Sequence, residues 1–181
     1  SRRSIYRFTE KKISQEILDQ ALLAASNAPC HKHTHPWKFY ILGKATRTKL
    51  IPTISRLAAI KSAKQNSHNL EADCSRAINK IIQPPLLIAV TSKKTEEDSF
   101  REKEDYAATV CALHNMVLSL WENGVGSQWS TGSITRDEET YDILSIDSKT
   151  EEIIGFVKAG YPEKSREVRK KPVVDIVNYL D

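Results

Sequence analysis

Residues 28–39 read Ala-Pro-Cys-His-Lys-His-Thr-His-Pro-Trp-Lys-Phe, and the rest of the chain is organised around this stretch. A proline near each end restricts the backbone where the chain enters and leaves it. The three histidines between the prolines offer donors and acceptors whose charge can change near neutral pH. We therefore expect a loop that is restricted at its ends and chemically versatile in its middle.

The segments on either side of this loop predict a helix and a strand. Residues 14–27 begin with Ser14, a natural N-cap, and carry apolar residues at helical spacing. Residues 38–42 are β-forming and are bounded by a proline and a glycine, which is typical of a strand. The histidine loop thus leads from the first helix directly into a sheet.

The middle of the chain predicts two more helical segments and a buried strand. Thr46 is a candidate cap for one helix, and residues 70–81 have helical periodicity. Between them, residues 61–68 are polar and predict a mobile connection. The continuous apolar run at 86–90 is typical of a central strand that is buried on both faces.

The second half predicts an exposed charged loop at 93–103, followed by an alanine-rich helix at 106–123 with an apolar surface broad enough for a subunit interface. Two glycines in 124–127 then predict a turn. A short helix at 136–146 and a strand at 153–160 complete the periodic part of the chain.

Composition limits the class of protein. The 181 residues with 40% hydrophobic content suit a single domain, and the excess of Lys plus Arg over Asp plus Glu, 27 to 23, suits a small anion such as phosphate but is too small for a nucleic-acid binder. Three widely spaced cysteines indicate neither a disulfide framework nor a thiolate zinc site. No apolar run reaches the roughly 18–20 residues of a membrane span and no signal peptide is evident, so we expect a cytoplasmic protein with no membrane partner.

Three further stretches could bind a ligand. Residues 2–4, Arg-Arg-Ser, combine planar guanidinium donors with a hydroxyl and form a plausible phosphate cradle, although a solvated arm is an equal alternative. Residues 128–133 place hydroxyls around Trp129 after the glycine turn, where backbone amides can approach a flat heterocycle, but such segments more often only turn the chain. Five cations in 164–171 are either a solvated face or a phosphate contact, and β-forming residues at 173–177 follow them.

The histidine loop also allows a metal site. If residues 31–35 were extended, His31, His33 and His35 would face one side, and imidazole suits zinc or copper. No acidic residue nearby supplies a fourth ligand, so ordinary loop histidines are the more common explanation. Cys30 could be a reactive thiol beside the imidazoles, but a packing cysteine is again the commoner case.

Four separated stretches together resemble the nitroreductase family of flavin-dependent oxidoreductases. They are the opening arginine segment at 2–8, the loop at 28–37, the glycine-tryptophan segment at 124–129, and Gly-Tyr-Pro at 160–162 with the basic tail after it. The resemblance implies an α+β fold with three layers, in which a central mixed β-sheet is flanked by helices. It further implies a single domain over 1–181 and an intertwined homodimer with FMN at the interface.

The resemblance also implies which residues bind the cofactor. Those implied for the FMN phosphate and ribityl chain are Arg2, Arg3, Ser4, Arg169 and Lys170. Those implied to run along the isoalloxazine ring are Trp129, Ser130 and Thr131. Those implied to reach the flavin of the partner subunit are His31, His33 and His35.

Two departures from the common family pattern are visible. Cys30, His33 and His35 stand where Ser, Asn and Gln are usual, so the loop is closer to a branch with a histidine after Ala-Pro-x, which makes His31 the best candidate flavin contact. The sequence also starts at the arginine motif, where family members generally have a further N-terminal helix.

The expected activity is hydride transfer from NAD(P)H through the flavin N5 to an electron-poor acceptor such as a nitroaromatic or a quinone, in a ping-pong cycle in which no side chain need act as a nucleophile. FMN would supply the redox chemistry, and the protein would supply orientation and electrostatics. One alternative keeps the fold but removes turnover, as in an FMN-binding storage or sensor protein. The other alternative is the histidine-loop metal protein.

Overall fold

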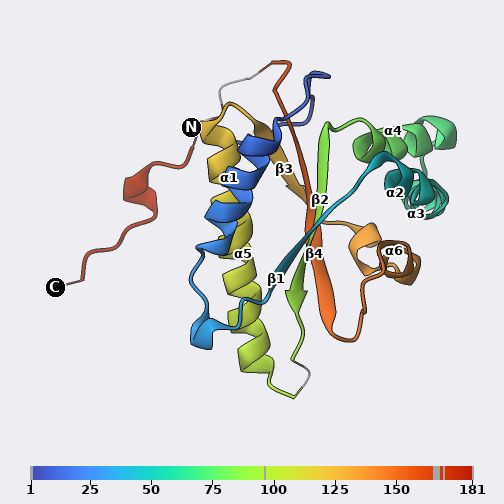
Figure 1. The fold of residues 1–181 in the computed structure, drawn as a ribbon. Coiled ribbons are helices and arrows are strands. Elements are labelled where there is room, and N and C mark those ends of the chain that lie inside the picture. The colour runs from blue at the N-terminus through green and yellow to red at the C-terminus, as the bar shows by residue number, and fades with distance from the viewer. Residues whose placement is uncertain (1, 96, 165–167, 169, 181) are drawn as a thin grey trace.

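Strands β2 (Leu86–Lys93) and β4 (Glu151–Gly160) form the centre of a four-stranded sheet. The strand order is β1-β2-β4-β3, which leaves β1 (Trp37–Ile41) and β3 (Gly126–Ser130) at the edges. The computed structural model describes residues 2–95, 97–164, 168 and 170–180, and Figure 1 shows their arrangement.

Helices cover both faces of the sheet, so the expected α+β architecture with three layers is confirmed (Figure 1). One face is covered by α1 (Gln15–Ser26) and α5 (Ser99–Glu122). The other face is covered by four helices, which are α2 (Lys44–Lys49), α3 (Ile51–Lys64), α4 (Leu70–Ile82) and α6 (Glu138–Leu144). None of the described helices combines the length and apolar character needed to cross a lipid bilayer.

The apolar run at 86–90 is the predicted central strand. Leu87, Ile88, Ala89 and Val90 are completely buried, because alternate side chains pack into separate hydrophobic cores on the two faces. The expectation of a mixed sheet is wrong for the four strands, whose three pairings are all antiparallel. In the described part of the chain, parallel pairing with these strands is limited to one bridge between Ser4 and Ser127.

The helix at 14–27 is confirmed, with the Ser14 hydroxyl accepting a hydrogen bond from the Ile17 amide at 3.3 Å. The long helix α5 begins seven residues earlier than its apolar spacing predicts, at Ser99 instead of 106. The reason is the N-cap residue Asp98, which cannot be distinguished in the sequence from the other charged residues around it. A carboxylate oxygen of Asp98 accepts from the amides of Phe100 and Arg101, at 3.1 and 2.9 Å.

Helix boundaries between β1 and β2 also differ from the predictions. Thr46 lies inside α2, whose N-cap is Gly43. Helix α3 has Pro52 in its first turn, where a proline removes no helical hydrogen bond, and it continues to Lys64, so the polar stretch 61–68 is half helical.

Two further segments adopt a different structure from the predicted one. The predicted glycine turn is limited to Gly124, which has a φ of +73°, and residues 126–130 continue as strand β3. In the tail, the β-forming residues 173–177 are exposed and form only a short 3₁₀ turn at Val173–Asp175, since none of the described strands pairs with them.

Three strands are joined at one end of the sheet by the buried carboxylate of Glu151. It accepts hydrogen bonds from Lys38 Nζ at 2.5 Å, Thr91 Oγ1 at 2.6 Å and Tyr40 Oη at 3.0 Å. Burial alone would raise the pKa of Glu151, but the donors Lys38, Thr91 and Tyr40 outweigh burial and hold the pKa below its ordinary value. This network ties β4 to both β2 and β1.

We expect Glu151→Gln to lower the free energy of unfolding at pH 7 by about 1–3 kcal/mol, because the variant loses a buried, charge-assisted acceptor. The stabilisation from a carboxyl group with a depressed pKa is complete above its unfolded-state pKa of about 4.3 and is lost as the pH falls through the lower folded-state value. Urea unfolding at several pH values should therefore show a difference that disappears in acid.

The matched control is Glu152→Gln, which neutralises the next residue on β4, whose side chain makes no hydrogen bond within the described structure. It should leave the free energy of unfolding within about 0.5 kcal/mol of wild type. Equal losses in the two variants would contradict the assignment of the network to Glu151.

Candidate functional site

A cleft of about 410 Å³ lies between helices α3 and α4 and the ends of strands β3 and β4. One wall is apolar and consists of Ile54, Leu57, Ala77, Ile81, Ile134 and Phe156. The lining also presents polar groups, from Ser130 at the end of β3 and from Thr131 and Ser133 directly after it. The cleft can therefore hold a flat apolar ring and offer hydrogen-bonding groups to its polar atoms.

A second cavity of about 540 Å³ adjoins this cleft. The two share four lining residues, which are Arg76, Lys80, Gln128 and Lys158. The second cavity is also lined by Tyr6, Arg7 and Phe8 of the N-terminal segment. A ligand could therefore extend from the apolar residues past a shared group of cations to Arg7, whereas the predicted phosphate contacts Arg2, Arg3 and Ser4 are not among the residues that line either cavity.

The shared cations come from two elements that face each other. Arg76 and Lys80 are one helical turn apart on α4, so they lie on the same face of that helix. Lys158 lies on β4, only 6% exposed, and its neighbours in register are Leu87 on β2 and Gln128 on β3. Burial, with a smaller contribution from the positive charge of Lys80, lowers the pKa of Lys158 to about 8.

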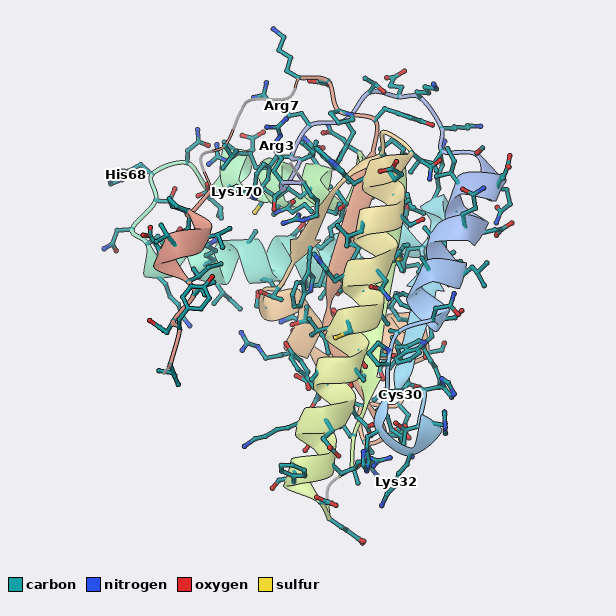
Figure 2. All side chains as sticks on the ribbon, turned by 90° about the vertical axis from the view of Figure 1, so that its left-hand side faces the viewer. Arg3, Arg7, Cys30, Lys32, His68 and Lys170 are labelled. Atoms are coloured by element: carbon teal, nitrogen blue, oxygen red, sulfur yellow. The ribbon has the colours of Figure 1, made fainter. Side chains whose placement is uncertain are left out.

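The N-terminal segment is fixed at this end of the sheet by backbone hydrogen bonds. The Ile5 amide donates to Ser127 O at 2.9 Å, and the Thr9 amide donates to Tyr161 O at 2.8 Å. The Arg3 guanidinium lies over the ring of Trp121, with 5.9 Å between its Cζ and the ring centroid. Figure 2 shows Arg3 and Arg7 at this end of the molecule.

The predicted ring-binding residues divide between two locations. Ser130 and Thr131 line the cleft, as expected for residues that run along a ligand. Trp129 points elsewhere: its Nε1 donates to Ile154 O at 3.2 Å, and its indole lies over Gly155, where a Cβ would come within 2.2 Å of that nitrogen. Side chains therefore alternate along β3, and only part of the predicted stretch faces the cleft.

The histidine loop lies at the opposite end of the molecule, as Figure 2 shows for Cys30 and Lys32. Residues His31–His33 form a 3₁₀ turn, and Lys32, His33 and His35 have φ values of 50°, 54° and 43°. The loop is attached to the start of α5, where Thr34 Oγ1 donates to buried Asp105 at 2.7 Å. It is not the extended segment on which the metal alternative depended.

No group of three potential metal ligands, drawn from His, Cys, Asp and Glu, exists in the part of the chain that the structure describes. His35 Nδ1 lies 3.8 Å from the Cys30 sulfur, and its ring packs edge-on against Trp37 at 5.6 Å. His31 Nδ1 lies 4.0 Å from Glu104 Oε1. Each of these two histidines thus has its own protein partner.

The two ends are far apart within one chain. Arg101 Nη2 donates to His31 O at 3.3 Å near the start of α5, and Arg3 contacts Trp121 near its end. At 1.5 Å per residue, the helix between these contacts is about 30 Å long. The histidines His31, His33 and His35 therefore do not share a site with Arg2, Arg3 and Ser4 inside a single chain.

The basic tail is described only in part. Lys170 is exposed and lies in the half of the molecule that contains Arg3 (Figure 2). Arg169, the other predicted phosphate contact, lies outside the described residues.

Comparison with known proteins agrees with this architecture. The sequence profile of the nitroreductase family matches residues 1–161. The chain belongs to the nitroreductase family. Over 177 residues it is 29% identical to the "Putative NAD(P)H nitroreductase YfhC" of Bacillus subtilis, an alignment that covers 97% of this chain and 88% of that protein.

Solved structures show the same fold at lower identity. A nitroreductase-like family protein from Bacillus cereus superposes with a TM-score of 0.81 at 24% identity, covering 99% of this chain and 92% of the other. A nitroreductase with bound FMN from Bacteroides fragilis superposes with a TM-score of 0.76 at 22% identity, covering 99% of this chain and 95% of the other.

The residues around the joined cavities fit the flavin that the Bacteroides protein binds. The apolar wall can receive the ring system, and the hydroxyl and amide groups of Thr131 and Gln128 can pair with polar ring atoms. Lys80, Arg76 and Lys158 supply positive charge beside it. A flat ring with an anionic end thus matches the donor set that this chain presents.

Sequence reasoning missed the three cations that the cavities share, whereas Gln128 lies in the stretch 128–133 that was a candidate for ligand binding. For Lys158 a signal exists, because it is the one charged residue in the otherwise apolar strand segment 153–160. For Arg76 and Lys80 no local signal exists, because exposed helix cations are common anywhere.

We expect Lys158→Met to raise the free energy of unfolding of the cofactor-free protein at pH 7 by about 1–3 kcal/mol, because a largely buried cation to which the described residues offer no partner is replaced by an apolar side chain of similar length. The pKa of Lys158 is about 8 in the folded state and 10.5 in the reference state. The penalty is complete below pH 8 and is relieved as the pH rises toward the unfolded value. Urea unfolding at increasing pH should therefore show a shrinking difference.

Lys93→Met is the matched control, since Lys93 is an exposed lysine at the end of β2. It should not stabilise the protein. The conclusion that burial of Lys158 lowers the free energy of unfolding would be contradicted by a Lys158→Met protein that is less stable than wild type at pH 7. A difference in stability that does not change with pH would contradict it as well.

Proposed function

We propose that this chain is an FMN-dependent oxidoreductase that takes a hydride from NAD(P)H and delivers it to an electron-poor acceptor such as a nitroaromatic or a quinone. The observation that carries the proposal is the pair of joined cavities, whose lining combines apolar side chains with hydroxyl, amide and cationic groups. When bound there, FMN supplies hydride transfer in a ping-pong cycle. The single domain over residues 1–181 would supply binding, orientation and electrostatics.

The N-terminal segment is suited to hold the cofactor phosphate. Arg2, Arg3 and Ser4 lie beside the start of β3, where the bridge to Ser127 fixes the backbone. Arginine offers two parallel donors to an oxyanion. Lys170 and Arg169 of the tail would add a second phosphate contact, while Ser130 and Thr131 would face the ring.

We further propose that the protein is an intertwined homodimer with two shared sites. Within one chain, the arginine segment and the histidine loop lie at opposite ends of α5. A single flavin can contact both only if the loop comes from a second copy. In that arrangement His31 would approach the partner's flavin, as in the branch of the family with a histidine after Ala-Pro-x, and His33 and His35 would complete the loop contact.

The proposed function is tested first by the visible absorption spectrum of the purified protein with added FMN, followed by NADH or NADPH without oxygen. We expect flavin bands that shift on binding and bleach on reduction, and that return when a quinone or a nitroaromatic is added. Bleaching without return under any acceptor would favour the storage or sensor alternative. No FMN binding at all would contradict the proposed function.

The shared site is tested by mixing two defective chains, one carrying Arg2→Gln with Arg3→Gln and the other carrying His31→Ala. Each homodimer should bind FMN at least tenfold more weakly than wild type, because each loses contacts worth about 1.4 kcal/mol or more. In a mixed dimer with shared sites, one site carries all the defects and the other carries none. Titration should therefore recover tight FMN binding at half of the sites of the mixed dimers, which is about a quarter of all sites when the two chains assort at random.

The control is riboflavin, which lacks the phosphate. The double arginine variant should lose little affinity for riboflavin, because its defect concerns the phosphate. If the mixed protein recovers no tight sites while sedimentation shows that mixed dimers have formed, the site lies within one chain.

A further inference from the structure

Lys158 is the charged side chain with the least explained position in this fold. It extends from the middle of the sheet toward α4, between Phe156 and Gly160 on the same face of β4. Its side chain lines both cavities, although the residue is only 6% exposed. The strand thus directs the ammonium group of a largely buried lysine to the place where the two cavities join.

The described residues offer this ammonium no partner. No described carboxylate lies within ion-pair distance of Lys158, and no hydrogen bond joins it to another described side chain or carbonyl. The carboxylate of Asp73, which also lines the cleft, is already engaged by Arg76 and by Ser62 Oγ at 2.9 Å. The remaining charged groups lining the two cavities are Arg7, Lys61, Arg76, Lys80 and Glu163.

The charge in the cavities is therefore mainly positive, with one of its two carboxylates occupied. A buried cation without a partner lowers stability, and proteins retain such groups where a ligand completes them. An anionic oxygen placed at the junction would gain a charge-assisted hydrogen bond in a partly desolvated position. The apolar wall beside it limits the rest of the ligand to a flat hydrophobic body.

We propose that Lys158 is the anion-binding residue of the cleft and pairs with a negatively charged oxygen of a flat aromatic or heteroaromatic ligand lying against Ile54, Leu57 and Phe156. This inference rests on the proposed function, because it assigns a ligand contact within the same site. Two ligands could supply this negatively charged oxygen. One is FMN through its phosphate, which carries the negative charge of the oxidised cofactor, and the other is an acidic aromatic acceptor that binds beside FMN.

The two sources are separated by binding measurements on wild type, Lys158→Met, Lys158→Arg and the exposed control Lys93→Met. The flavin-free proteins are titrated with FMN and with riboflavin by fluorescence quenching. The FMN-loaded proteins are titrated with 4-nitrobenzoate and with neutral 4-nitrobenzyl alcohol, using the change in the flavin spectrum. Thermal unfolding of each protein verifies that it is folded, and Lys158→Gln replaces Lys158→Met if the latter does not fold.

If FMN is the source, Lys158→Met should weaken FMN binding at least tenfold, Lys158→Arg should restore much of it, and Lys93→Met should match wild type. If the acceptor is the source, FMN affinity should stay within twofold of wild type. In that case the preference for 4-nitrobenzoate over the neutral alcohol should fall at least tenfold in Lys158→Met alone. Either pattern supports the inference.

Unchanged affinities for FMN and for 4-nitrobenzoate in Lys158→Met, with FMN bound normally by wild type, would overturn the inference and leave the proposed function standing. If wild type binds no FMN, the proposed function fails. The inference is then decided by calorimetric titration of the flavin-free proteins with 4-nitrobenzoate, where equal affinity in wild type and Lys158→Met would overturn it as well.

Discussion

Because the sheet is covered by helices on both faces, a charged side chain that is buried on one of its two central strands needs a partner away from bulk water. Two such side chains are buried on β4, at opposite ends of the strand. Glu151 has three donors on β1 and β2, so its burial fixes the relation of three strands. Lys158 has no partner among the described residues, so its burial costs stability. The end of the sheet at Glu151 is therefore stabilised by partners within the chain, whereas the end at Lys158 is incomplete without a ligand.

The incomplete end is assembled from segments that are distant in sequence. The N-terminal residues 6–8, helix α4, the end of β3 and the end of β4 meet around the two cavities. Their meeting depends on the strand order, because β3 and β4 are adjacent at the edge to which the N-terminal segment is bonded. The long chain connection through α3 and α4 then closes the face opposite α5. No single segment of this site would bind a ligand without the others.

The sequence predicts those elements whose structure depends on local features. The apolar run at 86–90 and the capped helix after Ser14 are correct, because burial and capping leave periodic signals. Strand β3 was mistaken for a turn, because its glycines and hydroxyls are turn formers and its pairing with β4 is a long-range contact. The start of α5 was missed, because the Asp98 cap is one carboxylate among many charged neighbours.

The residues of the candidate site also differ in whether local sequence features could predict them. Ser130 and Thr131 could be predicted from their sequence pattern, whereas Arg76 and Lys80 enter the site only because α4 packs beside β4. The alternation of His31, His33 and His35 predicts one shared face only for an extended segment. The positive φ values of Lys32 and His33 remove that alternation, and such a conformation is uncommon enough outside glycine that the residue types alone did not indicate it.

The separation of the arginine segment from the histidine loop has a consequence for the proposed assembly. In a dimer with two-fold symmetry, each shared site would take its phosphate-binding end from one chain and its histidine loop from the other. A cofactor bound across the two chains would bind the dimer more tightly than the separate monomers. By linkage, cofactor binding then favours association, and association favours cofactor binding. The 30 Å between the two ends within one chain would thereby make cofactor retention and self-association a single equilibrium.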